Sequence, residues 1–362
     1  MMRKLFFLLL LSAAFVNAQE MEWKKIVPPL EFSFPRDHGS HPDYRTEWWY
    51  FTGQVQTREG RRFGYQFTIF RVGIQAGEKK ADEPDMAPRQ ILAGHFAIAD
   101  IQNNGFRFAE RFRRIGAGFA DAALDDMHAW IGDWELKRNG NGEVSISALD
   151  RETAIGVEFS LSPSKPLVFQ ENGGYSKKGS ESGNASAYLS WTRMKTDGVL
   201  SFDGDEYPVS GASWFDHEWG SSQLGEGVQG WDWFGLHLDD GRDLMLYGLR
   251  NNDGEFIPES GGTLVDADGT AHPLTRDDFT MVPLQTWNSP ITGANYPVRW
   301  EIAVPDKNIS FQIQPMVDEA EMNAVSSLGV IYWEGPVEMI GKTTGRGYME
   351  LSGYATNLED RF

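Results

Sequence analysis

Alternating apolar and polar residues recur in short runs along the chain, and turn-forming residues separate these runs. The segments 299–304 and 310–315 alternate in this way, and a turn is expected between them at 305–308. Successive side chains of a β-strand point to opposite faces of a sheet, so each run predicts a half-buried strand. Convincing helical periodicity over a dozen residues is absent after the N-terminal segment. The pattern therefore favours an all-β chain.

Glycine-containing turn signals mark the ends of many of these runs. They are Asn104-Gly105, Asn139 to Gly142, Asp197-Gly198, Asp240-Gly241, Asp253-Gly254 and Asp268-Gly269. Asn-Gly and Asp-Gly favour the positive φ angles of tight hairpins, so many antiparallel strands are expected to close into barrels or sandwiches. Two polar stretches, 77–90 and 172–185, are expected to be long loops that act as lids or as plain insertions.

Two segments that resemble hairpins also resemble each other. Residues 48–55 and 231–238 share the pattern W-x-[Y/W]-F, and each continues through a turn into an apolar strand that ends in arginine, at Arg71 and Arg250. Such likeness arises by duplication or by chance between amphipathic hairpins. Duplication predicts two related β-barrel halves. The expected division of the chain is a signal peptide and two tandem barrel domains, at residues 1–18, 19–205 and 206–362.

The first residues have the features of a cleavable secretory signal. Arg3 and Lys4 precede an apolar run over residues 5–15, and Val16-Asn17-Ala18 offers small residues for cleavage. The apolar run is shorter than the ~20 residues that a membrane-spanning helix needs. A buried N-terminal helix is the alternative. We therefore expect an exported protein, periplasmic or secreted, that is not an integral membrane protein.

Composition limits the classes of partner. The chain is 41% hydrophobic and 13% aromatic, so it can build real cores, and its 13 tryptophans either fill barrels or line a pocket for an elongated apolar ligand. No cysteine is present, so the fold relies on its core without disulfides. The formal net charge of −19 argues against nucleic acid or an anionic membrane surface as partner.

The segment 213–220 (SWFDHEWG) places an imidazole and two carboxylates among aromatic residues. In an extended strand His217 and Trp219 share one face. Asp216 and Glu218 then share the other, and two close carboxylates raise the pKa of one by sharing a proton. The segment is either a catalytic site or a barrel corner whose carboxylates bind backbone groups.

A second aromatic strand begins at Trp231. Trp231 and Trp233 lie at even spacing from His237, so the three share a face, while Asp232 faces the other way. A histidine in a barrel interior lined by tryptophan either contacts a ligand or is a satisfied core residue. The similar N-terminal run adds the candidate contacts Trp48, Trp49 and Tyr50.

No motif supports a metal centre or a cofactor site. His38 and His41 have carboxylate neighbours, yet no second cluster with matching spacing follows. The sequence also lacks a G-x-S-x-G motif, a Gly-rich phosphate loop and an H-E-x-x-H motif. We therefore predict no metal and no cofactor, and nucleophilic hydrolysis has no motif to support it.

Four ordered motifs resemble the carotenoid 1,2-hydratase / AttH-like family, which is described as lipocalin-like. They lie at 47–53, 214–220, 231–234 and, at the C-terminus, 332–335 together with 347–353. The resemblance implies an all-β fold of two tandem lipocalin-like, calycin-type antiparallel β-barrel domains. Some members are similar to hydratases that add water to a double bond of an isoprenoid. Others are exported proteins that are linked to ABC transport systems or described as hydrolases, so the fold alone does not choose the function.

For a hydratase the resemblance implies a cofactor-independent site in which a carboxylic acid or an imidazolium protonates the alkene. Tryptophan faces would then stabilise the carbocation until water adds. The implied catalytic residues are His217, Trp219 and Tyr247, with Asp216 or Glu218 setting protonation. Hydratase-like members carry an acid two places after this tyrosine, where this chain has Leu249. The expected partner is an isoprenoid or another lipid-like molecule; a non-catalytic carrier that works with an ABC transporter, or a secreted hydrolase, is the alternative.

Overall fold

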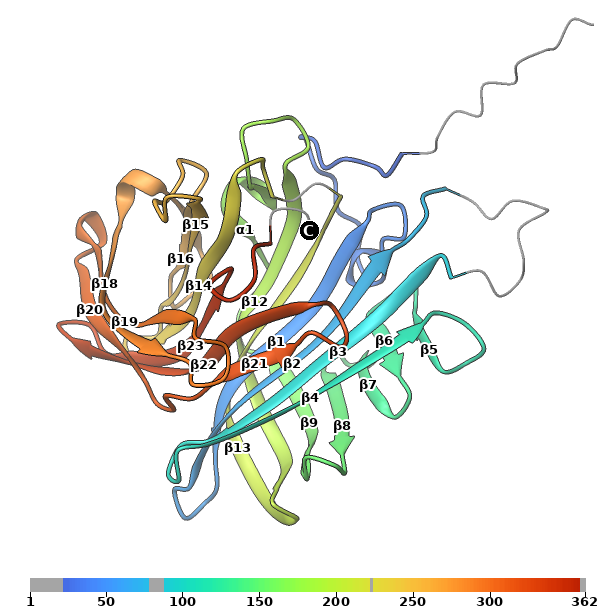
Figure 1. Cartoon of the computed structure of the whole chain (residues 1–362), viewed down its shortest axis with the longest axis horizontal. Coiled ribbons are helices and arrows are strands. Elements are labelled where there is room, and N and C mark those ends of the chain that lie inside the picture. Colours follow the sequence, from blue (N-terminus) through green and yellow to red (C-terminus); the bar gives the residue numbers. More distant parts are fainter. Residues whose placement is uncertain (1–21, 78–87, 222–223, 359–362) are drawn as a thin grey trace, which may run out of the picture.

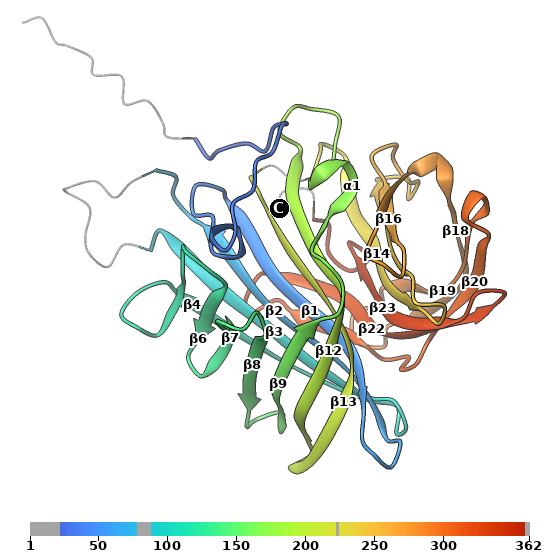
Figure 2. The same ribbon diagram turned by 180° about the vertical axis from the view of Figure 1, so that it is seen from behind.

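The computed structural model describes residues 22–77, 88–221 and 224–358, and these are almost entirely β-strand. The strands form two antiparallel sheets, each of which curls, and the sheets lie side by side (Figures 1 and 2). The all-β prediction is confirmed. The predicted signal peptide at residues 1–18 and most of the predicted loop at 77–90 lie outside the described residues. Within the described part, no helix has the length and hydrophobicity needed to cross a bilayer.

The first sheet has 13 strands in the order β4-β3-β2-β1-β13-β12-β9-β8-β7-β6-β5, with β10 and β11 paired to β12. Its strands are β1 (Thr46–Gln56), β2 (Arg62–Gly73), β3 (Gln90–Asp100), β4 (Gly105–Arg114), β5 (Ala120–Ala122), β6 (His128–Ile131), β7 (Trp134–Arg138), β8 (Val144–Asp150), β9 (Ile155–Pro163), β10 (Val168–Phe169), β11 (Tyr175–Lys177), β12 (Ala185–Phe202) and β13 (Asp205–Gly220). The sheet is preceded by the 3-10 helix η1 (Arg36–His38), and the short α1 (Gln170–Gly173) precedes β11.

The second sheet has 10 strands in the order β17-β16-β15-β14-β23-β22-β20-β19-β18, with β21 paired to β22. Its strands are β14 (Val228–Leu238), β15 (Asp243–Asn251), β16 (Gly261–Val265), β17 (Ala271–Thr275), β18 (Thr280–Asn288), β19 (Asn295–Val304), β20 (Ile309–Pro315), β21 (Glu321–Ala324), β22 (Val330–Gly341) and β23 (Gly345–Ser352). The 3-10 helix η2 (Arg276–Asp278) connects β17 to β18, the two end strands of this order, and η3 (Pro305–Lys307) connects the paired strands β19 and β20.

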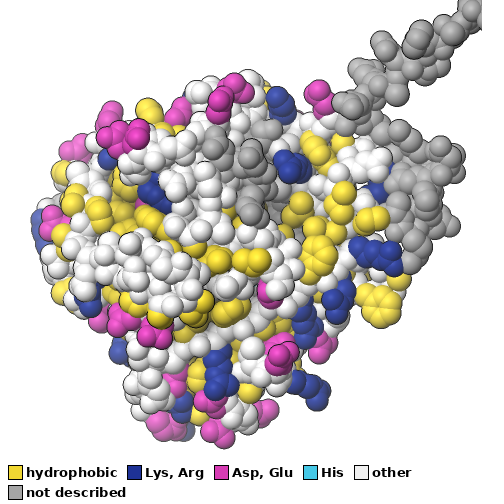
Figure 3. Space-filling model, in the orientation of Figure 1, with side chains coloured by type: hydrophobic (Ala, Val, Ile, Leu, Met, Phe, Trp, Pro, Cys, Tyr) yellow, Lys and Arg dark blue, Asp and Glu magenta, His cyan; other side chains and the backbone are white. Residues whose placement is uncertain are grey.

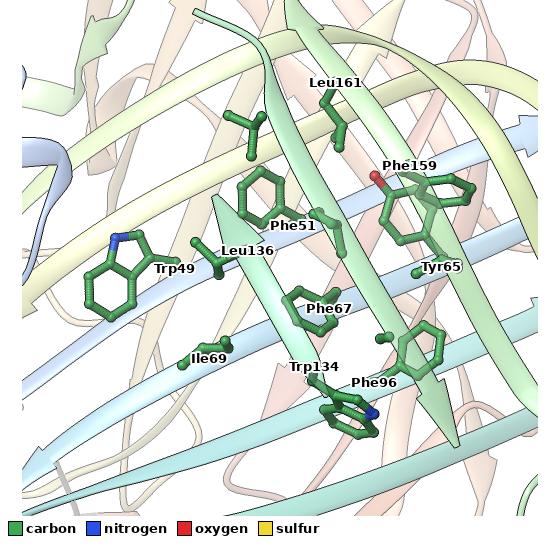
Figure 4. Close-up of a cluster of buried hydrophobic side chains, with 14 of the residues drawn as sticks. Trp49, Phe51, Tyr65, Phe67, Ile69, Phe96, Trp134, Leu136, Phe159 and Leu161 are labelled. Atoms are coloured by element: carbon green, nitrogen blue, oxygen red, sulfur yellow. The ribbon is translucent and has the colours of Figure 1, made fainter. Parts of the chain in front are cut away.

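Each sheet encloses its own core. In the first sheet, aromatic rings from β2, β3 and β7 pack against one another, among them Phe67, Phe96 and Trp134 (Figure 4). In the second sheet, Phe234 and Trp300 meet edge to face with centroids 5.7 Å apart. Burial of such large apolar surfaces is the main stabilising term in a chain without disulfides.

The two similar segments form equivalent hairpins. One is β1–β2 in the first sheet and the other is β14–β15 in the second. The arginine that ends each hairpin is buried and pairs with a buried carboxylate: Arg71 with Glu47, and Arg250 with Asp232. The first sheet includes β13, which begins at Asp205, so the strands change sheet between β13 and β14, after the boundary expected at residue 205.

Most predicted turns close hairpins, including the turn between β19 and β20. Asp197-Gly198 is the exception, because both residues lie inside β12 and pair with β9 and β13. A Cβ atom at Gly198 would lie 2.0 Å from the backbone oxygen of Glu158, so glycine is required there for the close approach of β9. The stretch 172–185, expected to be a loop, also contains the strand β11.

Candidate functional site

A cavity of about 90 Å³ lies between the two sheets. Strands β1, β2, β12 and β13 of the first sheet and β14, β15, β22 and β23 of the second line it. This volume is smaller than the ~150 Å³ cavity that admits benzene in an engineered protein. Its aromatic lining includes Trp48, Tyr50, Tyr188, Trp231, Trp233 and Tyr247.

The cavity is lined by the faces of the two sheets that point away from their own cores. On β1, Trp48 and Tyr50 line the cavity, whereas Trp49 between them belongs to the first core. On β22, Tyr332 and Glu334 line the cavity, while Trp333 belongs to the second core. The aromatic-lined cavity therefore lies between the two curled sheets, outside the core that each sheet encloses. In Figure 3 hydrophobic side chains gather over the middle of the molecule, with charged ones at its rim and lower end.

Strand β13 divides the predicted catalytic residues between its two faces. Asp216 and Glu218 line the cavity, as does Tyr247 from β15. His217 and Trp219 point to the opposite face, as expected for an extended strand. His217 and Tyr247, which the family resemblance assigns to one site, are thus separated by the sheet.

His217 is part of a buried polar network in the first sheet. Its side chain is fully buried, and Nε2 lies 3.0 Å from Glu47 Oε1. Its ring stacks on Trp49, with centroids 5.0 Å apart, and lies 4.7 Å from Trp219. Burial lowers the pKa of His217, although Glu47 raises it, so the imidazole is neutral at pH 7. It is therefore a poor acid for protonating an alkene.

Glu47 is the centre of this network. Its Oε2 accepts a hydrogen bond from Arg71 Nε at 2.7 Å, and its Oε1 lies 2.7 Å from His41 Nδ1. Burial alone would raise the pKa of Glu47, but Arg71 and His41 outweigh it and hold the pKa well below 4.5. Donor atoms of His41, Glu47 and His217 lie within 4.8 Å of one another, a spacing that suits a metal ion. Because Arg71 already neutralises the carboxylate, we assign the cluster a structural role.

Asp216 is held by three donors in the cavity wall. Its Oδ1 accepts hydrogen bonds from Ser190 Oγ at 2.5 Å and Trp214 Nε1 at 2.7 Å, and its Oδ2 accepts one from Tyr188 at 2.7 Å. Burial raises the pKa of Asp216 to about 7 in spite of these hydrogen bonds. Its environment therefore holds a carboxyl group that is partly protonated at neutral pH.

Two further acids line the cavity from the second sheet, and the sequence analysis did not single them out. They are Glu334 on β22 and Glu350 on β23. Burial, and then the neighbouring Glu350, raise the pKa of Glu334 well above 4.5. Burial raises the pKa of Glu350 to about 7, against hydrogen bonds from Ser352 and Trp231. The sequence did carry a signal, because each glutamate lies two residues after a buried tyrosine of its own strand and therefore shares that tyrosine's face.

Tyr247 and Leu249 form the wall contributed by β15. The Tyr247 hydroxyl donates to Glu171 Oε1 at 2.7 Å, and it lies 3.0 Å from the backbone oxygen of Glu259. Burial, and then Glu171, raise the pKa of Tyr247 well above 10. Lys178 lies 4.4 Å above the Tyr247 ring, so this end of the cavity carries a cation.

The remaining candidate residues lie in different places. Trp231 Nε1 donates to Glu350 Oε1 at 2.9 Å, and Trp233 Nε1 donates to Tyr188 at 3.0 Å, so both belong to the cavity. Asp232 points into the second sheet, where it pairs with Arg250. His237 does not line the cavity: Nε2 lies 2.7 Å from the backbone oxygen of Thr192, beside a separate polar cleft. The even spacing of His237 and Trp233 along β14 predicted one shared site, but the two residues line different cavities.

Comparisons with known proteins agree with this architecture. The sequence profile described as AttH-like matches residues 25–354. The crystal structure of an AttH protein from Nitrosomonas europaea is similar at 33% identity and a TM-score of 0.83, over 92% of this chain and 99% of that chain. Kievitone hydratase from Nectria haematococca is similar in fold, with 14% identity and a TM-score of 0.68, over 93% of this chain and 97% of that one. No curated protein sequence gives a significant match.

Proposed function

The chain belongs to the AttH-like family, and we propose that it binds the end of an isoprenoid or other lipid-like molecule between its two sheets and adds water to a carbon–carbon double bond there. The observation that carries this proposal is a small aromatic cavity lined by carboxyl groups whose pKa values burial has raised. A similar fold in kievitone hydratase is consistent with such a reaction. Export by the N-terminal signal is part of the proposal.

Hydration of an unactivated alkene needs a strong proton donor placed against the double bond. A carboxyl group that stays protonated at neutral pH supplies that proton, and the two alkene π electrons form the new C–H bond. The carbocation that results is stabilised by the faces of Trp48, Trp231 and Trp233, which line the same space. Water then forms the C–O bond and loses a proton, which restores the acid. No cofactor enters this scheme.

A carrier that holds the same ligand without converting it, together with an ABC transport system, is the second candidate. Leu249 favours it, because this cavity wall is apolar at the position where hydratase-like members carry an acid. Both candidates use one cavity, so one set of measurements separates them.

Farnesol, an acyclic isoprenoid alcohol, is a suitable probe. Binding is measured by quenching of tryptophan fluorescence, and hydration by mass spectrometry after incubation in water labelled with ¹⁸O. Leu249→Trp fills the cavity, whereas Leu149→Trp adds the same ring at an exposed position of β8. We expect wild type and Leu149→Trp to bind farnesol and incorporate the label, and Leu249→Trp to do neither.

The other outcomes assign the function differently. Binding without label supports the carrier and rejects the hydratase. If farnesol does not bind, or if Leu249→Trp binds it as tightly as wild type, the cavity is not the ligand site. Mass spectrometry of lipids extracted from protein purified from its native host tests the same point without a chosen probe.

A further inference from the structure

Glu334 and Glu350 form a pair of carboxyl groups across two neighbouring strands. They are directly opposite in the antiparallel register of β22 and β23, and both line the cavity. Opposite residues on one face of such a pair have Cβ atoms about 4.5–5.5 Å apart, and like charges there are destabilising. One of the two groups is therefore expected to keep its proton.

The two carboxyl groups have different surroundings. Glu334 is almost fully buried; its Oε1 accepts a hydrogen bond from Tyr50 at 2.5 Å, and its Oε2 has no hydrogen-bond partner among the described residues. Glu350 is half-buried, and its Oε1 accepts hydrogen bonds from Ser352 at 2.7 Å and Trp231 at 2.9 Å. Two donors stabilise an ionised Glu350, whereas Glu334 has an oxygen that is free to carry a proton.

The charges around the pair also favour a protonated carboxyl group. In the described part of the chain, no lysine, arginine or histidine forms an ion pair with Glu334 or Glu350. The cation that lines the cavity, Lys178, lies 3.2 Å from Glu218 Oε1 and so is already paired. Burial without a counter-ion favours the neutral form of a carboxyl group. The other titratable groups around the pair are Glu218 from β13, whose charge adds to burial in raising the pKa of Glu350, and the tyrosines Tyr50, Tyr332 and Tyr348, whose pKa values burial and then Glu334 raise. Trp231 from β14 and Ser352 from β23 donate hydrogen bonds to Glu350.

We propose that Glu334 is the proton donor to the double bond and that Glu350 is the base that takes the proton from the attacking water. This assignment rests on the proposed hydration. The O–H bond at Glu334 Oε2 breaks, and its proton and the alkene π electrons form a C–H bond. Water attacks the neighbouring carbon to form the C–O bond, and one of its protons passes to Glu350. Transfer of a proton from Glu350 to Glu334 restores both groups, so alkene and water give one alcohol.

Asp216 is a weaker candidate for this role, although the family resemblance implies that Asp216 or Glu218 sets protonation. Both of its oxygens accept hydrogen bonds, and Ser190, Trp214 and Tyr188 hold it in the wall. A proton shared within that set of donors is less free to move to a ligand. Both members of the pair line the same cavity as Leu249, the position where hydratase-like members carry an acid.

The test compares Glu334→Gln and Glu350→Gln with Glu338→Gln. Glu338 lies on the same strand as Glu334, is exposed and is opposite Arg346, so it is a matched control. Glutamine keeps the size and the acceptor for Tyr50 but cannot donate an acidic proton. We expect Glu334→Gln to lose about 100-fold or more of the ¹⁸O incorporation into farnesol while binding is unchanged, because general acids contribute about 10²–10⁴ in rate.

Two further measurements separate catalysis from structure. Glu350→Gln is expected to remove the acidic limb of the pH–rate profile, since the rate in wild type rises as Glu350 ionises near pH 7. The infrared difference spectrum between wild type and Glu334→Gln at pH 7 is expected to contain a protonated carboxyl band, and that between wild type and Glu338→Gln to lack it. That band tests the protonation of Glu334 without any ligand.

The outcomes distinguish this inference from the proposed function. Label incorporation by wild type together with a wild-type rate for Glu334→Gln, or with loss only in Asp216→Asn, overturns the inference and leaves the hydratase intact. No incorporation by wild type rejects the hydratase and the catalytic pair with it. Absence of a protonated carboxyl band from the difference spectrum between wild type and Glu334→Gln also overturns the assignment of the donor.

Discussion

Replacing Arg71 with methionine tests whether the network around Glu47 is structural. The Arg71 and Glu47 side chains are fully buried and make an ion pair at 2.7 Å. Arg71 Nη2 also donates to the backbone oxygens of His41 and Tyr44, each at 2.9 Å. Methionine keeps much of the volume of the side chain but removes the charge and these donors.

The expected loss of folding stability arises because the Glu47 carboxylate stays buried after Arg71 is removed. Removing one member of a buried ion pair costs about 3–5 kcal/mol, because the other charge stays desolvated. Glu47 keeps Ser40, the backbone amide and imidazole of His41, and His217 as partners, which favours the lower part of that range. Such a loss is a large fraction of the ~5–15 kcal/mol by which folded domains are stable.

Urea denaturation followed by tryptophan fluorescence measures this loss. The double variant Arg71→Met/Glu47→Gln is expected to be more stable than Arg71→Met alone, since it removes the unpaired charge. Arg107→Met, which breaks a half-exposed pair with Asp203, should change the free energy of unfolding by less than about 1 kcal/mol. A loss below about 1 kcal/mol in Arg71→Met, or no recovery in the double variant, would refute the structural role.

The difference in the free energy of unfolding between wild type and Arg71→Met is expected to decrease at acidic pH. The pKa of Glu47 in the folded protein lies below its ordinary value of 4.5. Its ionised form therefore contributes stability above pH 4.5, and that contribution is lost as the pH falls through the folded pKa. Arg71→Met raises this pKa, so the difference between wild type and variant should narrow in acid.

Three other variants probe separate features. Burial raises the pKa of Asp216 to about 7, so the stability that this group contributes falls as the pH rises from 3.8 to 7. Asp216→Asn should therefore gain stability relative to wild type between pH 5 and pH 8, as measured by urea titrations. Gly198→Ala should lose about 2 kcal/mol or more through contact with Glu158, whereas Gly140→Ala, with no atom within 4 Å, should not lower the thermal midpoint comparably. His217→Asn should lose about 1–3 kcal/mol of stability yet keep hydration of farnesol; loss of hydration in a folded variant would return this residue to the catalytic site.

The alternation of apolar and polar residues predicted the strands, but the glycine-containing dipeptides did not predict every turn correctly. Gly-containing dipeptides mark turns because glycine tolerates positive φ, yet glycine also serves where two backbones approach closely. Gly198 belongs to the second kind, and its neighbour Asp197 makes the dipeptide look like a hairpin signal. Only the position of β9, which is remote in sequence, distinguishes the two cases.

Strand parity separated His217 from Asp216 correctly, but it did not say which face meets the cavity. Residues 213–220 are all buried, because one face of β13 lies in the first core and the other between the sheets. A strand buried on both faces has no polar side to mark its orientation. Glu334 and Glu350 were within the motifs that carry the family resemblance, and their pairing depends on the register of β22 and β23. That register is a tertiary property.

The lining of the cavity by the outward faces of both sheets makes the site composite. Neither half of the chain, expressed alone, would contain it, so the cavity depends on docking of the halves as well as on the folding of each. The walls are also largely independent of the residues that stabilise each core. Substitutions in the walls can therefore change the shape and polarity of the cavity while the two cores stay constant.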